Sequence, residues 1–449
     1  MSQPLTVALL PWGDVIEDFL DSIGVSFESF CNDMTGGWLF GYVDALRTVG
    51  VRTVLFCISN RVTAIERHLH KPTGATICVL PALKLHSQIH RRMQNPYAYS
   101  IEEVFSSITP INRSFYKVLR DLSFYLATPL HLLAQELQQQ ACQAIVCQEY
   151  EYARFDACVL LGQWLRLPVF ATFQGGDFQL SRLERPLRPL ALRACAGLIV
   201  ATQTEIHRLQ SRYGISSTKI AQIFNPIDVK NWHVIDRQTA RAAIGLAATA
   251  QVVVYHGRIE LHRKGLDILL AAWEQLCQAL PGRELCLLLV GTGSSADQLR
   301  QLITDKQLSN ILWIDEYVRD RAAIQQYLAA ADVYTLPSRH EGFPVAPIEA
   351  MASGLPIVAT DAPGIPDILA GGEQSGGIVV PREDPIALAA ALQRVLIDRT
   401  FAAELGQRAR LRAETSFSLE AIGSQLRAFL WHETQPTDVK DQPQLETIK

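Results

Sequence analysis

The chain has 449 residues, a formal net charge of −4 and a pI near 6.3. Hydrophobic residues make up 48% of the sequence and charged residues 19%, a composition that excludes a largely disordered protein. The length predicts two domains of ~150–250 residues each. The slightly acidic balance argues against a general nucleic-acid binder, so no nucleic-acid partner is expected.

The cysteine pattern and the lack of long apolar runs indicate a cytoplasmic protein. The nine cysteines are scattered, with neither a C-x-x-C pair nor the Cys/His spacing of a zinc site, as expected in a reducing compartment. The N-terminal segment lacks the basic start of a signal peptide and resembles a first strand. No run approaches the ~20 apolar residues of a membrane-spanning helix. A location at the inner face of a membrane is left open.

Short apolar runs alternate with helix-length stretches, and six of them predict strands in the first half. They are Leu5–Leu10, Thr53–Ile58, Thr76–Leu80, Ala144–Val146, Val169–Thr172 and Leu198–Ala201. Strands separated by helices indicate βαβ units, so residues 1–225 are predicted to form a doubly wound α/β domain. The long connections 13–33 and 84–130 do not follow this alternation. They favour a functional insertion and local helical packing equally.

A second series of runs predicts another doubly wound α/β domain over residues 226–418. Its strands are Val252–His256, Leu285–Val290, Ile311–Ile314, Val333–Leu336, Ile357–Ala359 and Gly377–Val380. Turn residues at 225–228 predict a hinge between the two domains, which would face each other across a cleft. A helical pattern at 419–431 is expected to pack back on the first domain. Residues 433–449 form a polar tail.

Two cations in the second half predict an anion site. Arg258 follows the strand that ends at His256, which places it at a carboxyl edge of the predicted sheet. Lys264 precedes a helical pattern, and the free N–H groups of a helix start favour negative charge. Arginine grips two oxygens at once, whereas lysine adds a point charge. Solvated surface cations are the alternative for each residue taken alone.

Two carboxylates eight positions apart predict a site for hydroxyl groups. Glu341 lies on the loop after the strand Val333–Leu336, and Glu349 lies in the first turn of the following helix. The N–H groups of Gly342, Phe343 and Val345 are expected to line the same pocket. Compensation of the helix dipole is the alternative for Glu349, and a solvated loop charge is the alternative for Glu341.

These motifs resemble a known family. They are His256-Gly257-Arg258 with Lys264-Gly265, Val290-Gly291-Thr292-Gly293, Ala331-Asp332 with Pro337-Ser338, and Glu341-Gly342-Phe343 continued by the run from Glu349 to Thr360. Together they resemble the retaining glycosyltransferases of family 4, which have the GT-B fold. The resemblance covers residues 250–430 closely and the first half more loosely. It implies that residues 1–225 bind the acceptor and that residues 226–418 bind the nucleotide-sugar donor.

The resemblance implies a role for each matching residue. Arg258 and Lys264 would neutralise the donor diphosphate, and Glu341 would contact the donor sugar, so these three are the predicted catalytic residues. Glu349 would accept hydrogen bonds from the ribose diol. The glycine pair Gly36-Gly37 would let backbone N–H groups approach the phosphates, although a tight turn is the alternative.

Other donor contacts are expected from main-chain groups at Gly291 and Val318. One position departs from the family pattern, because Gln174 occurs where many relatives carry a histidine. Glutamine can hydrogen-bond a hydroxyl but takes no proton near neutral pH. Asp177 on the same loop is a further candidate, with turn capping as its alternative.

The sequence thus predicts a retaining glycosyltransferase that moves a sugar from a nucleotide-diphosphate-sugar to a hydroxyl acceptor. The acceptor class, whether polysaccharide, glycolipid or small-molecule glycoside, is left open, as are the donor, the linkage, the oligomeric state and membrane contact. No cofactor and no metal are expected, since two cations can stabilise the leaving diphosphate and no D-x-D spacing occurs. A basic rim is one interpretation of four arginines between 182 and 193 with Arg91 and Arg92, and a solvated helix face is the other.

Two other classes of function are alternatives to a glycosyltransferase. The motif Gly291-x-Gly293-x-x-Ala296 follows a strand, and Asp315 lies about twenty residues further on, as in a dinucleotide-binding fingerprint. A nicotinamide-dependent oxidoreductase or sugar-nucleotide epimerase would use it, but would leave the cations and carboxylates unexplained. A non-catalytic nucleotide-sugar binder is the third hypothesis, which the Gln174 departure supports.

Overall fold

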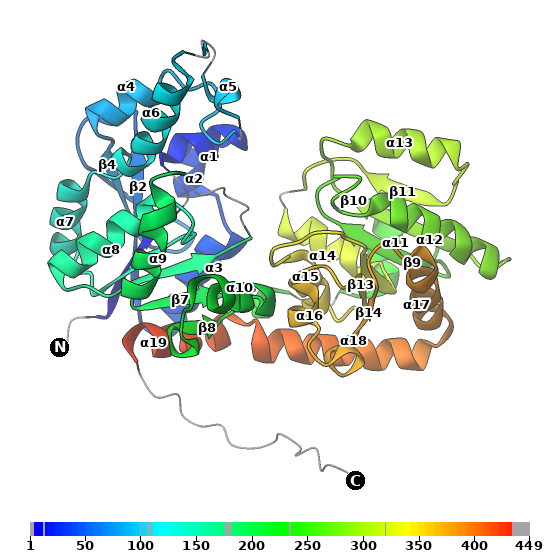
Figure 1. Cartoon of the computed structure of the whole chain (residues 1–449). Coiled ribbons are helices and arrows are strands. Elements are labelled where there is room, and N and C mark those ends of the chain that lie inside the picture. The colour runs from blue at the N-terminus through cyan, green and yellow to red at the C-terminus, as the bar shows by residue number, and fades with distance from the viewer. Residues whose placement is uncertain are drawn as a thin grey trace, which may run out of the picture.

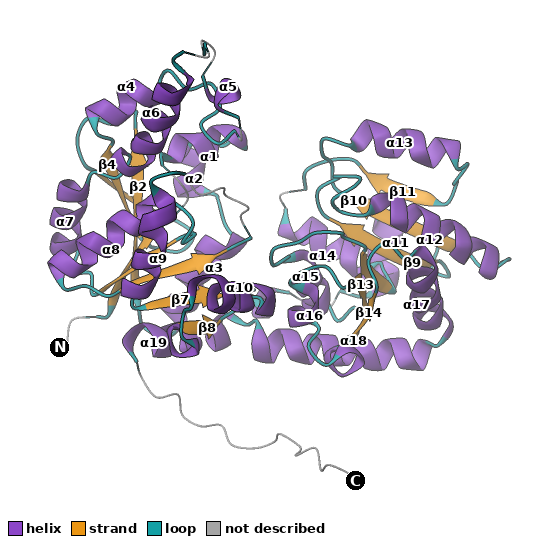
Figure 2. Cartoon of the chain, viewed as in Figure 1, coloured by secondary structure: helices purple, strands orange, loops and turns teal. Residues whose placement is uncertain are grey.

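The computed structural model describes residues 4–11, 14–98, 100–105, 108–109, 111–175, 181–232, 235–318 and 320–432. Within these residues the chain forms two α/β domains, each built on one sheet with helices on both sides (Figures 1 and 2). The class of fold predicted from the sequence is therefore confirmed. No helix in the described ranges is long and apolar enough to cross a membrane.

The described part of the first domain has an eight-stranded sheet in the order β3-β4-β2-β1-β5-β6-β7-β8. Its strands are β1 (Thr6–Leu10), β2 (Arg52–Ser59), β3 (Glu66–Leu69), β4 (Thr76–Pro81), β5 (Ala144–Cys147), β6 (Val169–Phe173), β7 (Gly197–Val200) and β8 (Ile220–Gln222). All neighbours pair in parallel except β3 and β4. Buried strands such as β5 are apolar along their whole length because helices cover both faces.

The helices of the first domain follow the strands in sequence. They are α1 (Ile16–Ser22), α2 (Phe27–Asn32), α3 (Gly37–Thr48), α4 (Lys84–His90), α5 (Ile101–Val104), α6 (Arg113–Leu126), α7 (Leu130–Gln139), α8 (Ala153–Leu165), α9 (Glu184–Ala194) and α10 (Gln203–Tyr213). The two long connections contain α1 and α2, and α4 to α6. Trp12 and Tyr99 lie outside the described residues.

The second domain has a six-stranded parallel sheet in the order β11-β10-β9-β12-β13-β14. Its strands are β9 (Gln251–His256), β10 (Leu285–Val290), β11 (Ile311–Ile314), β12 (Val333–Leu336), β13 (Ile357–Thr360) and β14 (Gly377–Val380). Its helices are α11 (Arg237–Ala243), α12 (Leu266–Ala279), α13 (Ala296–Asp305), α14 (Arg321–Ala329), α15 (Ala346–Ala352), α16 (Ile365–Ile368), α17 (Pro385–Ile397) and α18 (Arg399–Ser416). The strand order reverses between β9 and β12, where doubly wound sheets open a crevice for ligands.

The chain passes between the domains twice, and the two passages lie side by side. Ile227 pairs with Ser418 in an isolated bridge, and its N–H donates to the main-chain oxygen of Phe417 at 2.7 Å. The ring of Phe417 also lies 5.1 Å from that of Phe224. Two adjacent connections joined by main-chain and aromatic contacts restrain the relative motion of the domains to a hinge.

The last described helix, α19 (Leu419–Trp431), packs against α3 of the first domain (Figure 1). A Cβ at Gly423 would lie 2.1 Å from the main-chain oxygen of Ala45, so only glycine allows the helices to approach this closely. Nη1 of Arg427 donates to the main-chain oxygen of Val49 at 3.0 Å. The end of the chain therefore contributes to the core of the first domain.

Candidate active site

A cavity of about 260 Å³ lies at the crevice between β9 and β12. Its lining comes from the loops after these two strands and from one residue of the first domain. These residues are Gln174, Tyr255, His256, Gly257, Arg258, Arg263, Lys264, Leu336, Glu341, Gly342, Phe343, Pro344, Val345 and Ala346. The structure thus brings together Arg258, Lys264, Glu341 and the Gly342–Val345 loop, which the sequence places up to 87 positions apart.

Lys264 and Glu341 form a nearly buried ion pair in this cavity. Nζ of Lys264 donates to both carboxylate oxygens, at 2.7 and 2.9 Å, with 12% of the lysine side chain and 5% of the glutamate side chain exposed. Oγ of Ser338 donates to the same carboxylate at 2.6 Å. With its oxygens satisfied and little water nearby, the carboxylate keeps Lys264 oriented towards the crevice.

Arg258 lies on the same loop but in a different setting. Its side chain is 63% exposed, and its nearest ion-pair partner is Glu260, with Nη1 3.3 Å from Oε1. The loop itself is restrained, because the hydroxyl of Tyr255 donates to the main-chain oxygen of Arg258 at 2.8 Å. An exposed guanidinium on an anchored loop can reorient towards an incoming anion at little cost.

Glu349 lies in the first turn of α15, as the sequence predicts. Its Oε2 is 3.4 Å from Nε2 of His256 at the end of β9. Burial raises the pKa of Glu349 to about 7 and lowers that of His256 to about 4, so at neutral pH His256 is neutral and about half of Glu349 is ionised. Nδ1 of His256 is buried without a hydrogen-bond partner among the described residues.

Glycines bring the loops of the second domain together. A Cβ at Gly291 would lie 2.0 Å from the main-chain oxygen of Gly257, and one at Gly293 would lie 2.4 Å from that of Ile259. Gly265 has φ +63°, and its Cβ would lie 2.0 Å from the main-chain oxygen of Pro337. The glycines of the fingerprint-like motif are therefore required for packing against the Arg258 loop.

The two domains touch at the Gly342 loop. A Cβ at Gly342 would lie 2.9 Å from the main-chain oxygen of Gln174 and from Cα of Gly175, across the crevice. Phe343 stacks on Phe224 of the passage between the domains, with ring centroids 5.3 Å apart and planes at 8°. Phe343 thus connects the cavity wall to the hinge as well as lining the cavity.

Gln174 is positioned by contacts that the sequence does not reveal. Its Oε1 accepts a hydrogen bond from Nδ2 of Asn225 at 2.8 Å, and its N–H donates to Oε1 of Glu149 at 2.7 Å. Burial raises the pKa of Glu149 to about 8, and its Oε2 has no partner within the described ranges. Glu149 has φ +54°, a conformation that is uncommon for glutamate. Backbone strain and burial of a carboxyl group are typical of functional residues, but no sequence motif points to Glu149.

Glu349 and the remaining predicted residues within the described ranges lie outside the cavity lining. Gly36 and Gly37 have φ of +76° and +61° at the start of α3, and Cβ atoms there would meet no neighbour within 4 Å. Val318 packs against the hydrophobic core of the second domain. The main-chain oxygen of Gly291 accepts a hydrogen bond from the Trp313 indole at 2.9 Å. Asp177 lies outside the described residues.

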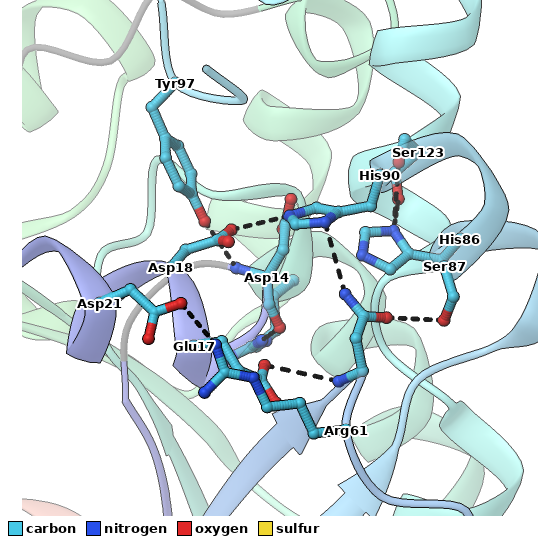
Figure 3. Close-up of polar contacts among 12 residues, drawn as sticks. Asp14, Glu17, Asp18, Asp21, Arg61, His86, Ser87, His90, Tyr97 and Ser123 are labelled. Carbon is cyan, nitrogen blue, oxygen red and sulfur yellow. Dashed lines mark hydrogen bonds and ion pairs between the residues drawn. The ribbon is translucent and has the colours of Figure 1, made fainter. Parts of the chain in front are cut away.

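A second polar cluster lies at the carboxyl edge of the first sheet, after β1, β2 and β4 (Figure 3). Nε2 of His90 lies 3.0 Å from Oδ2 of Asp18, and this contact raises the pKa of His90. Burial raises the pKa of Asp14 to about 7, and the N–H of Asp14 donates to the hydroxyl of Tyr97 at 3.2 Å. The edge of the first domain thus presents carboxyl, imidazole and phenol groups.

Loops that are distant in sequence are connected within this cluster. The N–H of Asn60 donates to Glu17 at 3.4 Å, and the side-chain oxygen of Asn60 accepts a hydrogen bond from Ser87 at 2.6 Å. His86 packs beside these groups, burial lowers its pKa to about 4, and its Nε2 has no partner in the described part of the chain. The sequence places His86 and His90 only within the irregular connection 84–130. It does not indicate their partners, because these come from other loops.

The basic rim suggested by the sequence is only partly present. Arg188 is fully buried and binds Asp156 at 2.8 Å and Glu184 at 3.2 Å, so it belongs to the core of the first domain. Arg182, Arg185 and Arg193 are exposed, as are Arg91 and Arg92. In the described ranges no three His, Cys, Asp or Glu side chains gather as a metal-ligand set.

Comparisons with known proteins identify the family of the chain. The profile described as glycosyl transferases group 1 matches residues 250–398, and that described as glycosyltransferase family 4 matches residues 92–231. The chain therefore belongs to the family 4 glycosyltransferases, a class of transferase enzymes with the GT-B fold. A D-inositol 3-phosphate glycosyltransferase from Jonesia denitrificans is 30% identical over 233 residues, which are 49% of this chain and 53% of that protein. The chain spans about half the length of the curated relatives it matches.

Solved structures show the same fold over nearly the whole chain. Sucrose-phosphate synthase from Thermosynechococcus elongatus superposes with a TM-score of 0.62 at 20% identity, covering 94% of this chain and 97% of that chain. HepE from Anabaena, solved in complex with UDP, gives a TM-score of 0.65 at 18% identity, covering 95% and 99%. At this identity the likeness establishes the two-domain fold.

Proposed function

We propose that the protein is a retaining glycosyltransferase that moves a sugar from a nucleotide-diphosphate-sugar to a hydroxyl acceptor. The observation that carries this proposal is the Lys264–Glu341 ion pair in the crevice between β9 and β12, beside the exposed Arg258. A site with two cations and a loop carboxylate suits a diphosphate joined to a sugar.

The reaction follows from these charges. The bond between the anomeric carbon and the diphosphate oxygen lengthens, and negative charge grows on the leaving diphosphate. Lys264 and Arg258 stabilise that charge, which is the kind of electrostatic effect that often contributes most to catalysis. The acceptor oxygen attacks the anomeric carbon on the face that the diphosphate leaves, and its proton passes to a diphosphate oxygen. Configuration is then retained without a protein base.

The other site residues hold the donor in place. Glu341 orients Lys264 and offers its carboxylate to the sugar hydroxyls. Glu349 would accept hydrogen bonds from the ribose diol when ionised. The side-chain nitrogen of Gln174 has no partner in the described part of the chain, while its Oε1 is held by Asn225, so the amide can donate to a sugar hydroxyl.

Neither a metal nor another cofactor is part of the proposed mechanism. Metal-dependent glycosyl transfer uses a divalent cation to neutralise the diphosphate, and two protein cations supply that charge here. Water is kept from the reacting atoms by the contact between Gly342 and Gly175, which closes the crevice on one side.

The donor and the acceptor are proposed by class. HepE from Anabaena is described in complexes with UDP and with UDP-glucose, so uridine donors are tested first. The relatives include a lipopolysaccharide core mannosyltransferase from Rhizobium meliloti and a phosphatidylinositol monomannoside mannosyltransferase from Corynebacterium glutamicum. We therefore propose a hydroxyl acceptor of the polysaccharide, glycolipid or small-glycoside type, used in the cytoplasm or at the inner face of the membrane.

The test is a thermal-shift and donor-hydrolysis panel over UDP-, GDP- and ADP-sugars, with and without EDTA. A donor that stabilises the protein and is slowly hydrolysed in EDTA supports the proposal and identifies the donor. Hydrolysis that disappears in EDTA would overturn metal independence. Stabilisation by a donor with no turnover under any condition would favour a non-catalytic binder instead. A thermal shift with NAD or NADP alone would instead favour the nicotinamide-dependent enzyme that the Gly291 motif suggests.

A further inference from the structure

Helix α6 turns its apolar side to solvent. Ile111, just before the helix, is 96% exposed, and Phe115, Val118 and Leu122 are 63%, 55% and 41% exposed. The last three are spaced i, i+3 and i+7, so they form one stripe along the helix. The opposite side of α6 buries polar groups, including Asp121 at 3% exposure. A surface helix of a globular domain normally has the reverse arrangement.

The stripe extends onto the neighbouring elements. Helix α4 lies beside α6 (Figure 1) and exposes Leu85 at 53%. On the other side, the N–H of Arg182 donates to Asp121 of α6 at 3.2 Å, and the adjacent Leu183 is 39% exposed. We call this surface the α6 face, and it consists of Leu85, Ile111, Phe115, Val118, Leu122 and Leu183.

Exposed arginines lie on the elements that flank α6. They are Arg91 and Arg92 after α4, and Arg182 and Arg185 near the start of α9. None of the four forms a side-chain ion pair with a described residue. Long basic side chains around an apolar stripe can extend their charges while their stems cover apolar surface.

Most acidic groups of the same region are already neutralised. Asp121 lies 3.1 Å from Nη2 of Arg120, and Glu102 lies 2.8 Å from Nε of Arg113. Glu103 in α5 adds one uncompensated negative charge. The α6 face therefore combines exposed apolar side chains with an excess of positive charge, on a chain whose overall charge is −4.

We propose that the α6 face is a docking surface for an anionic lipid bilayer. Apolar side chains would enter the boundary between headgroups and acyl chains, and the bordering cations would contact anionic headgroups. A second copy of the chain fits less well, because a two-fold interface would set the same four cations against each other. The proposal specifies the membrane contact of the proposed function, but it is independent of the donor chemistry.

The test is co-sedimentation of the full chain with lipid vesicles, which needs no nucleotide-sugar. Wild-type protein should bind vesicles containing about 30% phosphatidylglycerol more strongly than pure phosphatidylcholine vesicles. Binding should weaken when NaCl rises from about 0.1 M to about 0.5 M, because salt screens the cations. Turnover measured on soluble donor tests the proposed function separately, so either can fail alone.

Three variants separate the contributions. Phe115→Ser/Val118→Ser should lower the partition coefficient about tenfold, because apolar insertion is lost. Arg91→Gln/Arg182→Gln should lower it about fivefold for each charge and reduce the salt dependence. Ile386→Ser/Leu411→Ser removes side chains that are 69% and 60% exposed on the second domain, and it should bind like wild type. Circular dichroism checks that each variant is folded.

Several outcomes would overturn the proposal. These are wild-type protein that leaves anionic vesicles unbound, equal binding to both vesicle types, or equal loss in the control variant. A concentration-dependent dimer that disappears in Phe115→Ser/Val118→Ser, without vesicle binding, would assign the α6 face to a second copy instead.

Discussion

Arg258 and Lys264 carry the same charge in different surroundings, so their variants should behave differently. Arg258→Ala removes a side chain that is 63% exposed, and stability should change by no more than about 0.5 kcal/mol. Donor turnover should nevertheless fall by about 10²–10³-fold, because a cation at the leaving group is lost. Steady-state kinetics and thermal melting measure both effects.

Arg237→Ala is the matched control for Arg258→Ala. Arg237 is also an exposed arginine with one carboxylate partner, Asp332 at 2.7 Å, but it lies outside the cavity lining. Its removal should leave turnover within about twofold of wild type. An Arg258→Ala enzyme as active as this control would show that Arg258 has no part in the reaction.

Lys264→Ala should cost both stability and activity. It leaves the carboxylate of Glu341, which is 5% exposed, with only Ser338 as a partner, and breaking a buried ion pair costs about 3–5 kcal/mol. Lys264→Ala/Glu341→Gln removes the orphaned charge, so the melting temperature should recover while turnover stays at least 10²-fold low. Recovery of turnover in the double variant would assign Lys264 a structural role only.

Glu349 provides a test by pH. Its pKa is raised from 4.5 to about 7, so its neutral form is favoured in the fold. The stability that it contributes is present below about pH 4.5 and is lost as pH rises towards 7. Donor binding requires the ionised form, so the donor Kd should fall by up to about tenfold per pH unit from 6 to 7 and then level off.

Glu349→Gln should bind the donor more weakly and with little pH dependence across this range. Isothermal titration of a nucleotide-sugar at several pH values measures the slopes. The sugar diphosphate has no titrating group of its own in this interval, so the slope reports on the protein. Identical slopes in wild type and variant would mean that Glu349 does not contact the ribose.

At the scale of elements, the loop between β9 and α12 depends on one glycine. A Cβ at Gly265 would lie 2.0 Å from the main-chain oxygen of Pro337, and its φ is +63°. Gly265→Ala should destabilise the second domain by about 3 kcal/mol or more, because backbone must move to admit the methyl group. Differential scanning calorimetry should show a lower transition temperature for that domain.

Gly282→Ala separates the clash from the backbone strain. Gly282 has φ +78° in the same domain, but its Cβ would meet nothing within 4 Å. Its substitution should cost only about 1 kcal/mol. Equal losses of stability in the two variants would mean that the backbone at Pro337 can move away from the added methyl group at little cost.

Strands could be predicted from the sequence where burial on both faces of the sheet requires apolar residues. Runs such as Leu285–Val290 are apolar at every position because helices cover both faces of a parallel sheet, and the strand ends as predicted. Glu66–Leu69 carries charged and exposed residues on an edge strand, so its composition does not indicate a strand. Ile220–Gln222 is too short to show a period.

At the scale of the whole molecule, one of the contacts between the domains is made at Gly342, and another is made by Asp367 with Gln203 and Gln222. A Cβ at Gly342 would lie 2.9 Å from Gln174 and Gly175, so Gly342→Ala should hold the domains slightly apart. We expect kcat to fall by about 10–10²-fold, because a small misplacement across the cleft disrupts alignment of the reacting groups. The ratio of donor hydrolysis to transfer should rise as water enters.

Small-angle scattering and product ratios test this expectation. Gly24→Ala is the control, since Gly24 has φ +64° and open space around its Cβ in the first domain. It should share the modest strain without changing kcat. If Gly342→Ala keeps both kcat and the hydrolysis ratio, the observed contact between the domains is not needed for catalysis.

The sequence by itself determined the two doubly wound domains and the charged residues of the second one. Strand periodicity and burial act within a few residues, and the stretch from Glu341 to Glu349 is one loop and one helical turn, so local pattern suffices. Only the tertiary structure decided that Lys264 binds Glu341, 77 positions away, that Glu149 holds Gln174, and that Asp18 meets His90. These partners follow different strands, and strand order within a sheet, rather than distance along the chain, sets which loops meet. The apolar face of α6 was likewise hidden, because an amphipathic pattern does not state which side of a helix faces the core.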